Sequence, residues 1–155
     1  MDIYLNDPKR HKVYLAGPFF NEEQIQVATE VEKYAELAGL DYFSPRLRCC
    51  CPPDASYAQR AVSFDMNVKA IQQSDMVIAR IDDFDAGTMW EMGLAYANKR
   101  PVYAYTTVLG RGLNLMLAQS CKGFIRSLSQ LQLFMGAHGM VNWSIPNKIH
   151  NGEII

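Results

Sequence analysis

Short apolar runs that alternate with helix-length segments constrain the fold of this chain more than any other feature. Such runs are typical of buried β-strands, and the segments between them leave room for the crossover helices that parallel strands require. The runs are nearly continuously hydrophobic, which indicates strands covered on both faces. Four runs are clear and a fifth is weaker: VYLAG from Val13, LDYFS from Leu40, MVIARI from Met76, PVYAYT from Pro101, and the weaker MVNW from Met140.

The intervening segments carry helical patterns. Residues 21–40 repeat apolar side chains at roughly helical spacing and end near Gly39, a common type of helix stop. Further helices are expected within residues 56–75, 88–99, 113–120 and 128–136. Alternating strands and helices predict a single domain over residues 1–155. Its fold class is α/β, a flavodoxin-like (doubly wound) five-stranded parallel sheet with helices on both faces.

Composition limits the possible partners. The 155 residues are 49% hydrophobic and 20% charged, with a formal net charge of -1. Because this charge is balanced, there is no electrostatic case for nucleic acid or an anionic membrane as a partner. No apolar run approaches the roughly 20 residues of a transmembrane helix, and residues 1–12 lack the apolar core of a signal peptide. A cytoplasmic protein is therefore expected.

Cofactor and metal motifs are missing from the sequence. The turn AGPFFNEEQ after the first run has one glycine and matches neither the dinucleotide fingerprint nor the P-loop. Cys49, Cys50 and Cys51 are consecutive and lack the spacer with which two cysteines share a zinc ion. Reduced thiols are therefore favoured over a redox or metal cluster. We expect neither a cofactor nor a metal.

The acidic residues after the third run are the strongest candidates for a site. Ligands of open α/β sheets bind beyond the carboxyl ends of the strands, and Asp82, Asp83 and Asp85 follow a strand at that edge. Glu91 lies six residues beyond Asp85, within the apolar stretch MWEMGLA. A carboxylate in such surroundings is costly unless it is partnered or reactive. A solvated acidic loop followed by an exposed glutamate is the alternative.

Three further polar side chains are candidates, each with a structural explanation beside the functional one. Asp65 lies between Phe64 and Met66 in an expected helix, where it either serves a site or faces water. Asn114 either serves a site or caps a helix, as many asparagines do. Tyr14 lies inside the first strand, where an aromatic ring normally belongs to the core and its hydroxyl is bonded to a partner.

Four segments together resemble the nucleoside 2-deoxyribosyltransferases. They are VYLAGPFF, FDMNVKAIQQSDMVIARID, DAGTMWEMGLAYANKRPVYAY and LNLM, and they follow the family in order and spacing over residues 12 to about 120. In that family an aspartate in the helix before the third strand lies twenty residues before a second aspartate. The second aspartate lies six residues before a glutamate. Here these positions hold Asp65, Asp85 and Glu91.

The resemblance implies a role for each of these residues. Glu91 matches the nucleophile that attacks C1′ of a 2′-deoxynucleoside and holds the sugar as a covalent ester. Asp65 matches a proton donor near the leaving base, and Asp85 matches a ligand of the sugar hydroxyls. Tyr14 matches the phenol that orients the nucleophile. The implied chemistry needs neither a metal nor a cofactor.

Substrate-binding positions are implied in two of the matching segments. Phe19 and Phe20 fall where the family has aromatic residues against the base, and Gly17 stands in the same segment. The family counterpart of Asn114 reaches the site of a neighbouring subunit, and Met116 follows it in LNLM. The resemblance therefore implies a homo-oligomer whose sites are completed by a neighbour, with a deoxynucleoside and a free nucleobase as its small-molecule partners.

The implied function is transfer of 2-deoxyribose between nucleobases with retention of configuration. Hydrolysis of the N-glycosidic bond of a deoxynucleoside or its 5′-monophosphate is an alternative from the same chemistry. A non-catalytic small-molecule sensor is an alternative from another class. The turn GPFFNEE lacks the serine and arginine with which related nucleotide hydrolases hold a 5′-phosphate, whereas Arg46, Arg48 and Arg111 stand at other strand ends. Two stretches depart from the family pattern, RLRCCC in place of a turn with a glutamine and NGEII in place of a terminal tyrosine.

Overall fold

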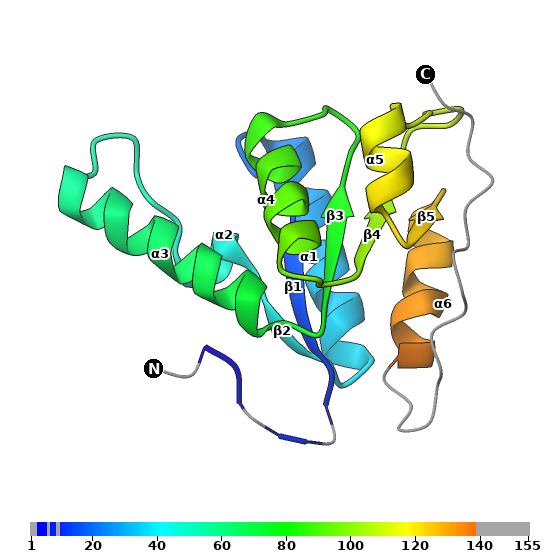
Figure 1. The fold of residues 1–155 in the computed structure, drawn as a ribbon, viewed down its shortest axis with the longest axis horizontal. Coiled ribbons are helices and arrows are strands. Elements are labelled where there is room, and N and C mark those ends of the chain that lie inside the picture. The colour runs from blue at the N-terminus through cyan, green and yellow to red at the C-terminus, as the bar shows by residue number, and fades with distance from the viewer. Residues whose placement is uncertain (1–2, 6, 9, 139–155) are drawn as a thin grey trace.

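One parallel sheet organises the computed structural model, which describes residues 3–5, 7–8 and 10–138 (Figure 1). In the described residues the strands follow the order β2-β1-β3-β4-β5, and every neighbouring pair is parallel. This is the flavodoxin-like order, so the predicted fold class is confirmed. The elements are β1 (Lys12–Ala16), α1 (Glu22–Leu37), β2 (Asp41–Phe43), α2 (Pro45–Arg48), α3 (Tyr57–Gln73), β3 (Met76–Arg80), α4 (Ala86–Ala97), β4 (Val102–Tyr105), α5 (Leu115–Ser120), β5 (Gly123–Ile125) and α6 (Leu128–His138).

The alternation of side chains along each strand divides the core into two layers. Val13 and Leu15 of β1 pack in the layer that contains buried residues of α1 and α6. Tyr14, between them, points the other way and packs with Ile71 of α3 and Met92 of α4. Both faces of the sheet are thus covered by helices, which explains why the strands are apolar throughout. The same alternation sends Tyr14 to the face that carries α3 and α4.

The long helix α3 is unusual because only its second half packs on the sheet. Its first half projects beyond the edge of the sheet (Figure 1), and the buried residues of α3 are Ala70 and Ile71. The projecting end is nevertheless well defined locally, because Ser56 and Gln59 form a capping box. A helix that projects in this way leaves apolar side chains on the surface, among them Val62 and Phe64.

Two features differ from the sequence-based expectations. The fifth strand of the sheet is β5, which pairs with β4, whereas the strand predicted from Met140 lies outside the described residues. The short helix α2 occupies part of a stretch expected as a turn, beginning with a proline at its first position. None of the helices in the described part of the chain combines the length and apolar character needed to cross a membrane.

Candidate active site

A tyrosine and a glutamate meet at the centre of the α3–α4 face. The hydroxyl of Tyr14 on β1 donates a hydrogen bond to Oε1 of Glu91 on α4, with an oxygen–oxygen distance of 2.6 Å. The Tyr14 ring is fully buried and stacks on Phe43 of β2, with ring centroids 5.6 Å apart. Because the ring is clamped in the core, the direction of its hydroxyl is fixed. One oxygen of Glu91 is thereby held while the other has no described donor.

Asn67 and Cys49 extend this pair into a cluster of four side chains. Asn67 Oδ1, on α3, lies 3.2 Å from the Tyr14 hydroxyl oxygen and 3.0 Å from Cys49 Sγ, just beyond α2. A phenol has one proton, and the carboxylate of Glu91 is the nearer and more basic acceptor, so we assign that proton to Glu91. Asn67 Oδ1 then lies beside the Tyr14 hydroxyl and accepts a hydrogen bond from the Cys49 thiol.

The surroundings of Glu91 favour its neutral form unusually strongly. Burial raises the pKa of Glu91 to about 7, the Tyr14 hydrogen bond opposes that rise, and the nearby charge of Asp85 adds to it. Burial and the same glutamate raise the pKa of Tyr14, which therefore stays protonated as a donor. Burial also raises the pKa of the Cys49 thiol to about 11. Near neutral pH, Glu91 is thus poised between acid and carboxylate, which is typical of reactive groups.

Asp85 has a structural partner as well as a place beside Glu91. It is the N-cap of α4, and its Oδ2 accepts hydrogen bonds from the backbone N–H of Thr88 at 2.8 Å and from the Thr88 hydroxyl at 2.9 Å. The preceding residue, Phe84, adopts a φ of 47°, a region that bulky side chains rarely enter. This strained turn directs the chain from β3 into α4, the helix that carries Glu91.

Asp65 lies away from this cluster. It is exposed on α3, and within the described residues no hydrogen bond or ion pair involves it. The helical period explains the difference, because residues two positions apart point about 200° apart around the axis. Since Asn67 faces Tyr14, Asp65 must face the opposite side. The role of Asp65 as a proton donor therefore stays a prediction.

Asn67 was missed because the sequence argument followed charge rather than helical phase. The buried face of α3 is marked by Ala70 and Ile71. Residues three and four positions before these fall on the same face, which selects Asn67 and excludes Asp65. Cys49 gave no comparable signal, because its place depends on where α2 ends.

The predicted aromatic residues lie together on the turn after β1. The rings of Phe19 and Phe20 stack with centroids 5.7 Å apart, and Phe20 is 75% exposed. Gly17 is close to β3, since a Cβ atom there would lie 3.3 Å from Cβ of Arg80. These residues therefore present an aromatic surface at the carboxyl edge of the sheet without a covering partner among the described residues.

Asn114 and Met116 lie at the start of α5, without a described hydrogen bond to the Glu91 cluster. Asn114 is the N-cap of α5, and its Oδ1 accepts a hydrogen bond from the Leu117 N–H at 2.9 Å. Met116 is 75% exposed. The capping explanation for Asn114 is therefore confirmed, and a substrate-binding role for Asn114 and Met116 stays a prediction.

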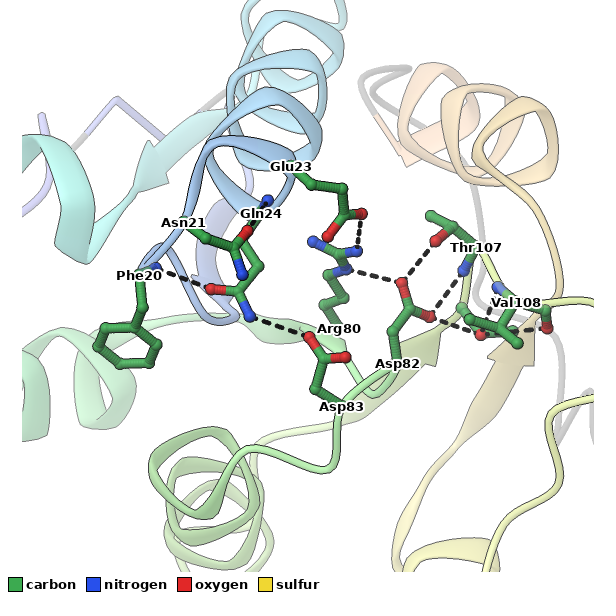
Figure 2. A network of polar contacts seen from close by, with 10 residues as sticks. Phe20, Asn21, Glu23, Gln24, Arg80, Asp82, Asp83, Thr107 and Val108 are labelled. Carbon is green, nitrogen blue, oxygen red and sulfur yellow. Dashed lines mark hydrogen bonds and ion pairs between the residues drawn. The ribbon is translucent and has the colours of Figure 1, made fainter.

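The acidic residue Asp82 belongs to a separate network of hydrogen bonds and ion pairs (Figure 2). Its carboxylate accepts hydrogen bonds from Arg80 Nε at 2.7 Å, the Thr106 hydroxyl at 2.6 Å and the Thr107 backbone N–H at 2.8 Å. The second arm of Arg80 reaches Glu23 at 2.6 Å. Although burial alone would raise the pKa of Asp82, these donors outweigh it and lower the pKa. Asp82 thus ties together the ends of β3 and β4.

Two of the three arginines that could bind a phosphate already contact other groups of the protein. Arg46 forms an ion pair with the buried Glu32, and Arg48 donates to the backbone carbonyl oxygen of Ile3 at 3.3 Å. Arg111 lies over the ring of Phe84, 5.1 Å from its centroid. Within the described residues all four cysteines are free, and no three potential metal ligands cluster together.

Fold and site together define a class: doubly wound α/β proteins whose carboxyl edge carries a glutamate suited to nucleophilic or acid–base chemistry. The model of a known family, nucleoside 2-deoxyribosyltransferase, matches residues 13–124. The chain belongs to this family. Its membership supports an enzyme that transfers deoxyribose or cleaves a related N-glycosidic bond.

Solved structures agree with the family assignment. A 2-deoxyribosyltransferase from Bacillus psychrosaccharolyticus is 31% identical with a TM-score of 0.72, covering 78% of this chain and 90% of that one. Two more distant structures share the fold alone. A conserved protein from Enterococcus faecalis is 20% identical with a TM-score of 0.56, covering 82% and 86% of the two chains. A CMP N-glycosidase from Clostridium botulinum is 15% identical with a TM-score of 0.57, covering 79% and 97%. No curated protein matches the sequence.

Proposed function

We propose that this protein transfers 2-deoxyribose from a 2′-deoxynucleoside to another nucleobase through an ester on Glu91. The observation that carries the proposal is the hydrogen bond from Tyr14 to Glu91, in surroundings that raise the pKa of the glutamate to about 7. Family membership and the 31% identical 2-deoxyribosyltransferase support the choice of reaction. A carboxylate held in this way is suited to capture an oxocarbenium-like sugar.

In the first step, the Glu91 oxygen that Tyr14 does not hold attacks C1′ of the deoxyribose. The bond between C1′ and the base nitrogen breaks, its electron pair leaves with the base, and a proton joins that nitrogen. The Tyr14 hydroxyl holds Oε1 of Glu91 and so restricts the rotation of the carboxylate, which leaves Oε2 without a described donor. Desolvation makes the carboxylate a stronger nucleophile than it is in water, at the cost of a smaller ionised fraction at neutral pH.

In the second step, a nitrogen of the incoming base attacks C1′ and Glu91 leaves as a carboxylate. The proton of that nitrogen passes to Asp65, which the family resemblance implies as the donor of the proton in the first step. Each displacement inverts C1′, so the two together retain its configuration. The pKa of about 7 suits both steps, because the group must be a nucleophile first and a leaving group afterwards.

Substrate contacts follow from the surrounding turns. Asp85 Oδ1 has no described donor and is the oxygen that would accept a sugar hydroxyl, while Phe19 and Phe20 would stack against the base. Cys49 also lines a groove of about 410 Å³, whose lining does not include Tyr14, Asn67 or Glu91. The other lining residues of the groove are Arg48, Cys50, Cys51, Pro52, Ala58, Gln59, Val62, Ser63 and Met66.

We place Asn114 and Met116 in the site of a neighbouring subunit, as the family resemblance implies for Asn114, and we keep Asp65 as the proton donor near the leaving base. Asn114 and Met116 are exposed and have no described hydrogen bond to the Glu91 cluster of their own chain. An exposed aromatic pair, Phe64 and Trp90 with centroids 5.3 Å apart, supports a homo-oligomer. The test mixes Asn114→Ala subunits with Glu91→Gln subunits. Shared sites predict partial recovery of activity in the mixture, and self-contained sites predict none.

Incubation with deoxyinosine, with and without adenine, tests the reaction itself. Deoxyadenosine that forms only when adenine is present, and is absent with Glu91→Gln, supports transfer. Release of hypoxanthine at the same rate in both mixtures indicates hydrolysis instead. No change in deoxyinosine or in a panel of other deoxynucleosides and their 5′-monophosphates contradicts both.

A further inference from the structure

Gln24 is a buried amide in the otherwise exposed first turn of α1. It is 8% exposed, whereas Asn21, Glu22 and Glu23 are all exposed. Its backbone N–H is taken by the N-cap side chain of Asn21 at 2.9 Å. Its side chain makes two further hydrogen bonds, one to each of two turns at the carboxyl edge of the sheet.

The two ends of this amide hold two different turns. Gln24 Oε1 accepts a hydrogen bond from the Phe20 backbone N–H at 2.8 Å, and Gln24 Nε2 donates one to Asp83 Oδ2 at 3.0 Å. Figure 2 shows Gln24 lying between Phe20 and Asp83. The first turn follows β1 and carries the stacked rings of Phe19 and Phe20. The second follows β3 and leads into Asp85, the N-cap of α4.

We propose that Gln24 is a positioning residue that fixes the distance between the aromatic turn and the acidic turn. This inference rests on the proposed function, in which the first turn holds the base and the second holds the sugar. A nucleoside spans both turns, so an error in their spacing weakens one contact whenever the other forms. Gln24 does not touch the reacting atoms, and its effect is transmitted through the two turns.

The chemistry of the two contacts requires an amide at this position. The Phe20 N–H needs an acceptor and the Asp83 carboxylate needs a donor, and a glutamine supplies both from one planar group. A glutamate of the same size keeps the acceptor but sets a second carboxylate against Asp83. The arrangement therefore allows a swap: Gln24→Glu breaks the contact, and Asp83→Asn in the same chain restores it by reversing donor and acceptor.

The experiment measures kcat and KM for a deoxynucleoside in Gln24→Glu, Asp83→Asn and the double variant. We expect kcat/KM of Gln24→Glu to fall about tenfold or more, mainly through a higher KM, because one hydrogen bond is lost and a repulsion is added. The double variant should recover most of that loss. Glu30→Gln is the matched control, since Glu30 lies on the same helix and its one described hydrogen bond comes from the half-buried Tyr34.

A second measurement separates this inference from the proposed function. Glutamate keeps an oxygen acceptor, but its repulsion from Asp83 should displace the side chain from the Phe20 N–H, so hydrogen exchange of the Phe20 amide should speed up in Gln24→Glu. Exchange should return toward the wild-type rate in the double variant, whether or not the protein turns over any nucleoside. If the wild type lacks turnover, the proposed function fails and the exchange data still test the link. An unchanged Phe20 exchange rate in Gln24→Glu overturns the inference, and so does an unchanged KM despite faster exchange.

Discussion

Glu91 and Asp82 are two shielded carboxylates at the same edge of the same sheet, and their environments shift their pKa values in opposite directions. Asp82 accepts hydrogen bonds from Arg80, Thr106 and Thr107, and its pKa is lowered. Glu91 has one described donor, Tyr14, and its pKa is raised to about 7. Burial acts on both groups in the same sense, so the number of donors decides the sign.

The contrast separates a carboxylate that holds the fold from one that is available for chemistry. Both carboxylate oxygens of Asp82 already accept hydrogen bonds from residues at the ends of β3 and β4, so they are not available to a substrate. Glu91 retains one oxygen without a described donor. The two groups can therefore be distinguished by which property each substitution damages, activity or stability.

Glu91→Gln should have the largest effect on activity, a loss of more than about 10³-fold in kcat, because the amide cannot form the ester. Stability should respond in the opposite sense. The folded pKa of about 7 exceeds the ordinary value of 4.5, so Glu91 contributes stability at low pH that is lost as the pH rises through 7. The variant should therefore exceed the wild type in unfolding free energy by roughly 1–3 kcal/mol at pH 8, and the gap should close near pH 4. Urea unfolding at both pH values measures this. A variant that is less stable at pH 8 would contradict the assigned environment.

Asp82→Ala should show the reverse pattern. It leaves the buried guanidinium of Arg80 with Glu23 as its remaining described acid partner, and breaking a buried pair typically costs about 3–5 kcal/mol of unfolding free energy. Below the melting transition, kcat should stay close to that of the wild type. Urea unfolding with kinetics on the same samples checks both halves. A stable but inactive Asp82→Ala would place this residue in the chemistry and remove the contrast.

Tyr14→Phe sharpens the comparison by removing the donor of Glu91. Since the Tyr14 hydrogen bond lowers the pKa of Glu91, its loss should raise that pKa further above 7. The reaction needs the carboxylate, so the rise of kcat/KM with pH should shift to higher pH, and activity at pH 7 should drop by about 10–100-fold. Much of that loss should be regained at pH 9. A uniform loss at every pH would mean that Tyr14 acts in some other way.

Substitutions of Asp85 should have the smallest effect on stability, and two of them can be compared at this one position. Asp85→Asn keeps the cap on the Thr88 N–H, whereas Asp85→Ala removes it and should cost about 1 kcal/mol of unfolding free energy. Both remove the charge that raises the pKa of Glu91, so the rise of kcat/KM with pH should occur at lower pH in both variants than in the wild type. Thermal unfolding and pH–rate profiles of the pair separate the cap from the charge.

The main elements of the fold were predictable because β1, β3 and β4 are long enough to read as apolar runs. The strand β5 was not, since Gly123–Ile125 is three residues long and opens with a glycine. Its strand character comes from pairing with β4 rather than from its own sequence. The four-residue helix α2 is likewise too short to show a period.

The site was predictable to the extent that it depends on local order along the chain. Tyr14 on a buried strand and Glu91 six residues after Asp85 follow from strand alternation and helix length. Whether Asp65 or Asn67 faces the Tyr14–Glu91 pair depends on which face of α3 packs on the sheet. That packing is set by tertiary structure, and in the sequence only Ala70 and Ile71 indicate it. The contact of Cys49 with Asn67 joins residues from α2 and α3 and has no local signal.

The most direct test of the central claim is the mass of the protein after it is mixed with a deoxynucleoside and quenched rapidly in acid. The account predicts an increase equal to one deoxyribosyl group, mapped by peptide digestion to Glu91 and absent from Glu91→Gln. A wild-type protein that turns over the nucleoside but carries the sugar on another residue, or carries none, would contradict it.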